Sequence, residues 1–146
     1  MSLAVKELTD PIYGANYLLL FGTLAQLRAW GSTGKEGSLV RTIADGMADG
    51  ECRGRYLQVE ANSDGCTYHA VFVRSDLGAV GLFTVPAHEA FHAATAVLLD
   101  RGLRLSPDSE EAFAYLQTYL LEHFYTLMHT KQKRRLVRRL VKRSKS

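Results

Sequence analysis

The sequence predicts an α+β domain, in which a small N-terminal sheet with one short helix is followed by longer helices. Short apolar runs bounded by turn residues fill the first half of the chain, which is typical of buried strands. After Pro86 the apolar residues recur instead at helical spacing. With 146 residues, 47% of them hydrophobic, the chain can form one domain with its own core, which we place at residues 1–130.

The expected elements of the first half follow in order. The apolar and aromatic run 12–21 predicts a buried strand. Thr23 is a suitable N-cap for a short helix that ends near Gly31. Residues 31–55 are rich in Gly, Ser and Asp and predict loops, with either a strand or a short helix at Leu39–Ile43.

Three strands and two helices are expected next. The strands cover 55–60, 67–74 and 78–85, and a tight turn joins the last two as a hairpin. The first helix runs from about Pro86 to Arg101, with proline in its first turn. The second begins after Ser106 as N-cap, with Pro107 at its first position, and continues to about His129 as a long helix that packs on the domain.

Charge is divided unevenly along the chain, although the net charge is only +3. Residues 1–130 hold nine Lys and Arg against fifteen Asp and Glu, whereas residues 131–146 hold nine basic residues and no acid. Leu and Val recur at helical spacing in the second segment, which predicts a basic amphipathic C-terminal helix. Its cations are expected to contact nucleic acid or another polyanion; they are Lys133, Arg134, Arg135, Arg138, Arg139, Lys142 and Arg143.

The basic segment leaves other partners open. An anionic membrane surface and the acidic body of the protein are alternatives to nucleic acid, and a solvated charged helix is the simplest one. No aromatic residue follows Tyr125, so any nucleic-acid binding should be nonspecific and sensitive to salt.

The cysteine content and the start of the chain bear on where the protein works. Cys52 and Cys66 are too few for the disulfide framework of a small secreted protein. The first ten residues lack the apolar core of a signal peptide, and the longest purely apolar run is too short to cross a bilayer. We therefore expect a cytoplasmic protein without a transmembrane segment.

The strongest functional motif is HExxH, formed by His88, Glu89 and His92 on the first long helix. Histidines four residues apart lie one turn apart on the same side of a helix, so both imidazoles can bind one metal ion. Glu89 lies beside them, where its carboxylate can take a proton from a zinc-bound water. The alternative is a pair of histidines that pack or face solvent, but the acidic residues downstream favour zinc.

A third zinc ligand is expected at the start of the second helix. The chain climbs about 15 Å from His92 to Gly102 and then returns through a short loop, which brings that start back near the histidines. Glu111 is the preferred ligand and Glu110 the alternative, because the spacing does not decide between them. Tyr115, one turn after Glu111, can either hydrogen-bond an oxyanion or pack as a core aromatic.

The remaining histidines and cysteines are expected to stay outside the metal site. His123 lies about 120° around its helix from Glu111, and His129 lies about 27 Å along it. Cys66 and His69, with Cys52, offer only three ligands for a second zinc site, and strand alternation would separate His69 from its neighbours.

The pattern HEAFH, followed after about nineteen residues by SEEAFAYL, resembles the glutamate zincins, a class of zinc metallopeptidases. It is more closely similar to small zinc-peptidase-like proteins of tailed bacteriophages, over about residues 78–121 and more loosely from residue 12. The resemblance implies a zincin-like domain that hydrolyses peptide or amide bonds in the host cytoplasm. It also implies a zinc ion held by two histidines and one glutamate, with a second glutamate as general base: His88, His92, Glu111 and Glu89.

Two functional hypotheses follow from these features. The first is a zinc-dependent metallopeptidase or related hydrolase that acts on an unidentified peptide or protein through metal-activated water. The second is a nucleic-acid or polyanion binding protein, in which the zinc site is structural or inactive and the basic tail makes the contact.

Overall fold

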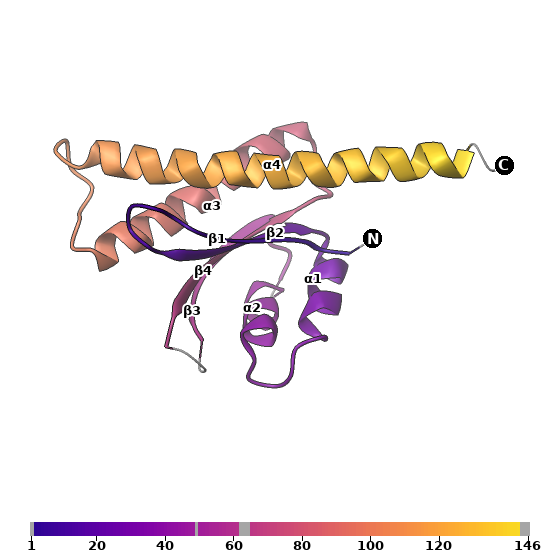
Figure 1. Cartoon of the computed structure of the whole chain (residues 1–146), viewed down its shortest axis with the longest axis horizontal. Helices are drawn as coiled ribbons and strands as arrows, with labels where there is room; N and C mark the ends of the chain where they lie inside the picture. Colours follow the sequence, from indigo (N-terminus) through magenta and orange to yellow (C-terminus); the bar gives the residue numbers. More distant parts are fainter. Residues whose placement is uncertain (1, 49, 62–64, 144–146) are drawn as a thin grey trace.

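A computed structural model describes residues 2–48, 50–61 and 65–143, with the backbone alone from residue 135 onward. Within this part of the chain, one sheet has helices packed on both of its faces, which confirms the predicted α+β class (Figure 1). The strands are β1 (Ala4–Thr9), β2 (Asn16–Gly22), β3 (Gly54–Glu60) and β4 (Thr67–Arg74). The helices are α1 (Leu24–Gly31), α2 (Leu39–Met47), α3 (Ala79–Asp100) and α4 (Glu110–Arg143).

The strands lie in the order β1-β2-β4-β3. β1 and β2 are antiparallel, β2 and β4 are parallel, and β4 and β3 are antiparallel. Because parallel neighbours need a long crossover, the chain passes through α1, α2 and β3 before it adds β4 beside β2. This order leaves β3 at one edge of the sheet, next to α3.

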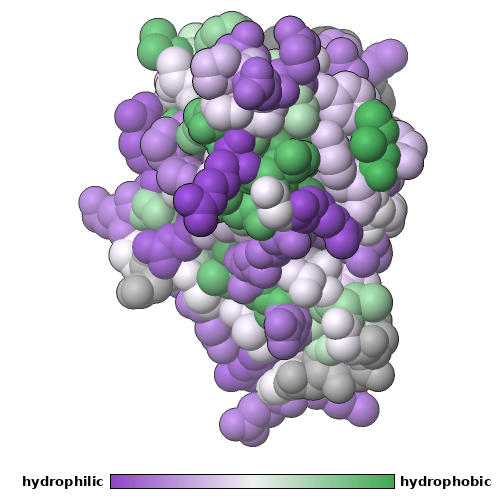
Figure 2. Space-filling view, turned by 90° about the vertical axis from the view of Figure 1, so that its left-hand side faces the viewer, coloured by the Kyte–Doolittle hydropathy of each residue, from purple (hydrophilic) through white to green (hydrophobic). Residues whose placement is uncertain are grey.

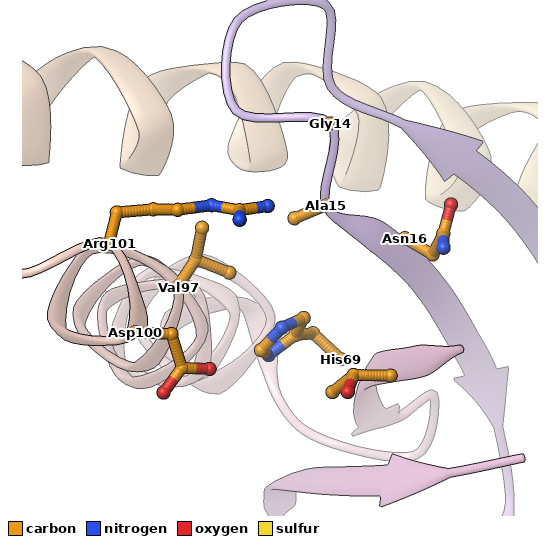
Figure 3. Close-up of a pocket in the computed structure, with 8 residues that line it drawn as sticks. Gly14, Ala15, Asn16, His69, Val97, Asp100 and Arg101 are labelled. Carbon is orange, nitrogen blue, oxygen red and sulfur yellow. The ribbon is translucent and has the colours of Figure 1, made fainter. Parts of the chain in front are cut away.

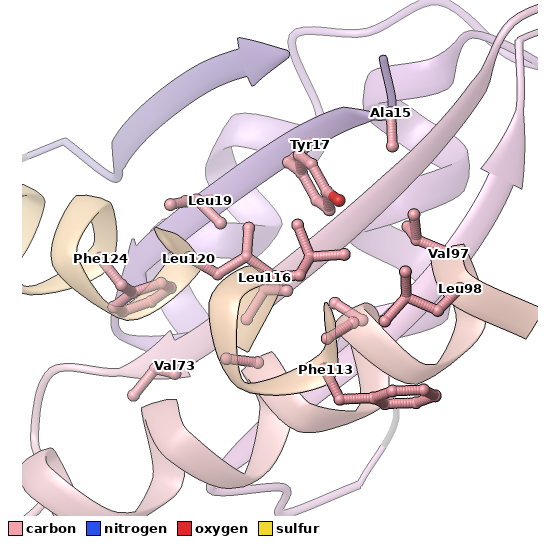
Figure 4. Packing of buried hydrophobic residues seen from close by; sticks show 14 of the residues in the cluster. Ala15, Tyr17, Leu19, Val73, Val97, Leu98, Phe113, Leu116, Leu120 and Phe124 are labelled. Atoms are coloured by element: carbon pink, nitrogen blue, oxygen red, sulfur yellow. The ribbon is translucent and has the colours of Figure 1, made fainter. Parts of the chain in front are cut away.

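The two central strands are buried on both faces, which explains why β2 reads as a continuous apolar run. Tyr17 and Leu19 point toward α3 and α4 (Figure 4), and Phe21 belongs to the same core. Leu18 and Leu20 belong instead to the core beneath α1 and α2. Successive side chains of a strand alternate between its faces, so one strand supplies both cores.

The turn between β1 and β2 is organised by Asp10, whose side chain is 1% exposed. Its Oδ1 accepts hydrogen bonds from the backbone N–H groups of Ile12 (3.0 Å) and Tyr13 (2.6 Å). Its Oδ2 accepts from the N–H of Ala15 (3.0 Å) and from the hydroxyl of Tyr17 (3.3 Å). These hydrogen bonds hold the residues before β2 in a turn. The strand expected from residue 12 therefore begins only at Asn16. β1 was not expected; it is a short edge strand in which half-buried and exposed residues alternate.

The helical hairpin of α1 and α2 agrees with the local sequence signals. Thr23 is the N-cap of α1 and forms a capping box with Gln26, in which each side chain accepts the backbone N–H of the other residue. The stretch 39–43, for which strand and helix were both open, belongs to α2. Gly31 permits the close packing of the two helices, because a Cβ at that position would overlap the Cβ of Ala44.

The strand predicted over residues 78–85 is wrong, because Gly78 is the N-cap of α3 and the helix includes residues 79–85. The apolar run of these residues is also compatible with a helix, in which Gly81 is buried against the body and Val80 is exposed. Pro86, expected in the first turn, lies inside the helix. Its missing N–H removes one backbone hydrogen bond, yet the tertiary packing of α3 keeps the helix continuous.

The last helix also differs from the sequence prediction at both ends. Ser106 and Pro107, expected to start it, lie in the preceding loop, and α4 begins at Glu110. It does not end near His129 but continues as one helix of 34 residues through the expected boundary between body and tail. In the part of the chain that the structure describes, no helix has the length and apolar character needed to cross a bilayer.

Candidate functional site

Helix α3 brings the two histidines of the HExxH motif together. The Nε2 atoms of His88 and His92 lie 3.0 Å apart, and their ring centroids are 4.6 Å apart. Both side chains are exposed on the helix surface. Two imidazole nitrogens therefore converge on a point that solvent can reach.

Glu89, between these histidines in the sequence, is only 8% exposed. Its carboxylate accepts a hydrogen bond from the backbone N–H of Tyr56 on β3. Burial raises the pKa of Glu89 above its ordinary value, while His88, His92 and the Tyr56 bond partly oppose that rise. The carboxyl group is thus brought nearer to the range in which it can exchange a proton at neutral pH.

An open hollow of about 500 Å³ lies in front of Glu89, between α3 and the edge strand β3. The residues that line it are Arg53, Gly54, Thr84, Val85, His88 and Glu89. Gly54 is needed here because a Cβ on it would overlap Val85 and lie 3.0 Å from the Cγ of Glu89. The close approach of β3 to α3 therefore depends on a missing side chain.

Glu111 and Tyr115, the other predicted site residues, lie at a different place. They line a separate hollow of about 410 Å³ on α4, together with Ala114, Thr118, Tyr119 and Glu122. The hydroxyl of Tyr119 donates to the carbonyl of Thr9 (3.3 Å), so this face of α4 is directed toward β1. Glu111 and Tyr115 are therefore not brought into the hollow that contains His88 and Glu89.

Glu110 lies on another side of the same helix. The amide of Gln117 donates to the carbonyl of Ala87 (3.1 Å), which marks the side of α4 that contacts α3. Glu110 precedes Gln117 by seven residues, about two full turns, whereas Glu111 is displaced from it by about 120°. Among the described residues, no group of three or more His, Cys, Asp and Glu side chains is close enough to hold a metal ion.

His123, Cys52 and Cys66 were not expected in the metal site. Nδ1 of His123 lies 2.8 Å from the Nζ of Lys6 on β1, and its ring packs edge-on against Tyr119. Cys52 and Cys66 do not form a disulfide, and the thiol of Cys52 donates to a backbone carbonyl in α2.

From the sequence, His69 was only excluded from a second zinc site, and the structure shows two features of this residue. The side chain is 4% exposed and packs between Tyr17 and Tyr56. Its Nδ1 lies 2.9 Å from the hydroxyl of Tyr56, and burial lowers the pKa of the imidazole. His69 also lines a cavity at the carboxyl end of α3, together with Asp100 and Arg101 (Figure 3). The adjacent opposite charges at the end of a helix were the only sequence signal of this cavity.

Helix α4 anchors the first residue of the basic segment to the body. The Nζ of Lys131 donates to the carbonyl of Phe21 (2.8 Å) and to the Oε1 of Gln26 (3.2 Å). Lys133 and Arg134 are exposed. The side chains of the other predicted contact residues lie outside the described part of the chain: Arg135, Arg138, Arg139, Lys142 and Arg143.

The chain was compared with known proteins in three ways. Protein-family models, curated proteins and solved structures were each compared with the chain, and none of them matches it.

Proposed function

We propose that this protein is a zinc-dependent hydrolase of the metallopeptidase type, with its centre on α3. The observation that carries the proposal is the convergence of the His88 and His92 Nε2 atoms at 3.0 Å. Two nitrogens bound to one tetrahedral zinc at 2.0–2.1 Å would be about 3.3 Å apart, so the pair needs little movement to serve as two ligands.

Glu89 is the general base in this proposal. When held by His88 and His92, zinc would supply an activated water near neutral pH, and Glu89 would take up the proton of that water. Glu89 lines the same hollow as His88, and its raised pKa suits it to accept a proton and to donate it later to a leaving amine. The backbone N–H of Tyr56 holds its carboxylate in place.

The third ligand is proposed to come from the first turn of α4. The resemblance to glutamate zincins favours Glu111, with Tyr115 on the same face as an oxyanion partner. Helical geometry favours Glu110, which shares the side of α4 that contacts α3. In either case the start of α4 must move toward the histidines when metal binds.

The position of the hollow supports an extended peptide as substrate. β3 is an edge strand, and an edge strand can pair with an extended segment through its backbone groups. Gly54, at the start of β3, lines the hollow beside Glu89. A peptide added along this edge would pass in front of the proposed base.

The first experiment is zinc content by elemental analysis, after loading and removal of excess metal. About one zinc per chain is expected in the wild type, with loss in H88A and in H92A and retention in the control H129A, because His129 is an exposed residue of α4. The variants E110Q and E111Q identify the third ligand by which of them lowers zinc affinity. Equal zinc content in wild type, H88A and H92A would contradict the proposal.

The second experiment separates binding from chemistry. E89Q should retain zinc but lose hydrolysis of a library of internally quenched peptides by about 10²-fold or more, because the amide cannot accept a proton. Full activity of E89Q would rule out Glu89 as the base.

A second candidate function, polyanion binding, is favoured by the continuity of α4. The helix continues past the sheet and presents its basic end away from the body (Figure 1). The wild type should bind a DNA duplex at low salt with an affinity that falls steeply as salt rises. A truncation after Lys131 should abolish binding and preserve the anchoring contacts of that lysine. Salt-independent binding, or binding by the truncated chain, would contradict this function.

A further inference from the structure

A cavity of about 320 Å³ lies at the end of the molecule opposite the projecting tail (Figure 3). It is bounded by the start of β2, by β4 and by the carboxyl end of α3. Ala15 and Val97 supply apolar wall, and both are buried. Figure 2 views the molecule from this end and shows hydrophilic residues around smaller hydrophobic areas. Concave sites with apolar walls and a few polar groups are typical of small-molecule binding.

His69 presents an unused polar atom to this cavity. Its Nδ1 is occupied by the hydroxyl of Tyr56 at 2.9 Å, whereas the bond from that hydroxyl to Gln58 is longer, at 3.4 Å. Burial raises the pKa of Tyr56, so its hydroxyl keeps its proton at neutral pH, and we assign it as the donor to Nδ1. The proton of the neutral imidazole then lies on Nε2, which has no partner within the described residues.

The side chain of His69 is 4% exposed, and its unpartnered Nε2 is not among the fully buried atoms of the described residues, so it is open to the cavity that His69 lines. A donor in that position is satisfied by water or by a ligand with an acceptor atom. The ring of His69 extends from β4 toward α3, where the cavity lies (Figure 3). The residue therefore points to a ligand with an acceptor atom.

Asp100 and Arg101 place opposite charges on the cavity wall without pairing with each other. One guanidinium nitrogen of Arg101 donates to the carbonyl of Tyr13 (2.7 Å). The Oδ2 of Asp100 accepts from the amide of Gln58 (3.3 Å). Among the described residues, the ion pairs within 4.0 Å join other side chains. Each charged group thus keeps hydrogen-bonding capacity for a ligand.

We propose that this cavity binds a small zwitterion of the α-amino acid class, with its carboxylate on Arg101 and His69 and its ammonium group on Asp100. A simple anion would meet the carboxylate of Asp100, and a simple cation would meet the guanidinium of Arg101. A ligand that carries both charges satisfies both residues. The apolar contribution of Ala15 and Val97 suits an aliphatic side chain. None of these residues belongs to the proposed zinc site, so the inference is independent of it.

The test is a titration of the full chain at pH 7, followed through the imidazole nitrogen signals of His69 by NMR. Three matched probes are used: L-valine, 3-methylbutanoate, which lacks the amino group, and isobutylamine, which lacks the carboxylate. L-valine should shift the His69 signals in a saturable manner. Each analogue should bind at least about tenfold more weakly than L-valine, because it leaves one charged residue unpaired. Equal affinity for L-valine and either analogue, or no saturable shift with L-valine, would overturn the proposal.

Two variants provide the specificity control, since both residues are exposed and outside the core. D100N should lose the preference for L-valine over 3-methylbutanoate, and R101Q should lose the preference for L-valine over isobutylamine. Thermal unfolding of both variants checks that the fold is intact. L-valine affinity that neither substitution changes would also overturn the proposal.

Discussion

Two buried polar groups of this protein, the carboxylate of Asp10 and the hydroxyl of Thr95, have opposite local environments. The carboxylate of Asp10 accepts four hydrogen bonds, three of them from backbone N–H groups. Within the described residues, the buried hydroxyl of Thr95 has no partner at all. Because a buried polar group costs free energy unless it is paired, the first residue should stabilise the fold and the second should weaken it.

The prediction for Thr95 is that T95V increases the free energy of unfolding by about 1 kcal/mol, because the substitution removes an unpaired hydroxyl and keeps the shape of the side chain. Urea denaturation measures the change. The control is T130V on α4, whose hydroxyl is exposed and bonded to Thr126, and it should change stability by less than about 0.5 kcal/mol. A destabilised T95V would show that the hydroxyl has a partner in solution.

The prediction for Asp10 is that D10A lowers the free energy of unfolding by about 3 kcal/mol, since several backbone N–H groups lose their acceptor. The control is D45A, which removes a solvent-exposed ion pair with Arg41 and should have an effect near zero. Equal midpoints for the two variants in the same urea series would contradict the structural role of Asp10.

At the scale of elements, the approach of β3 to α3 depends on Gly54. The variant G54A should lower the free energy of unfolding by about 1–3 kcal/mol, because its Cβ overlaps Val85 and crowds Glu89. If the proposed zinc centre is correct, G54A should also reduce hydrolysis more than zinc content. G78A is the control for steric overlap, because no atom lies within 4 Å of a Cβ there. Since Gly78 is the N-cap of α3 and alanine is a poorer cap, G78A should lower the free energy of unfolding by about 0.5 kcal/mol, less than G54A. Similar losses in both variants would contradict the steric argument.

Elements with a local signal could be predicted from the sequence, and elements decided by tertiary packing could not. The capping box of α1 and the apolar period of α3 after Pro86 are local features, and both helices were expected. Residues 78–85 carry an apolar run that fits a strand or a helix, and packing against the body selects the helix. The candidate site likewise combines a feature set by local sequence with one set by tertiary packing. The convergence of His88 and His92 follows from four-residue spacing, whereas the location of Glu111 depends on how α4 rotates against β1.

For the whole molecule, the buried His69 makes stability depend on pH. Burial lowers the pKa of His69 below its ordinary value of 6.5, so the unfolded chain binds this proton more readily than the folded one. Stability is therefore lost as pH falls below about 6.5 and is retained above it. The charged groups Asp100 and Arg101 act on the imidazole in opposite directions, and burial is the larger cause.

The expected measurement is the difference in unfolding free energy between wild type and H69Q over pH 5–8. The advantage of the wild type should shrink as pH falls from about 6.5, because only the wild type must bury this imidazole in its neutral form. H129Q, at an exposed histidine of α4, is the control for the His→Gln substitution itself. A pH-independent difference for H69Q would contradict the buried, neutral state.

The unbroken course of α4 also has a mechanical consequence. Twelve residues of the helix follow Lys131, and at 1.5 Å per residue they form a rod of roughly 18 Å that shares its axis with the part packed on the sheet. A partner bound to this helical segment would be held at a fixed orientation to the hollow beside Glu89. A flexible tether of the same length would fix neither direction nor distance.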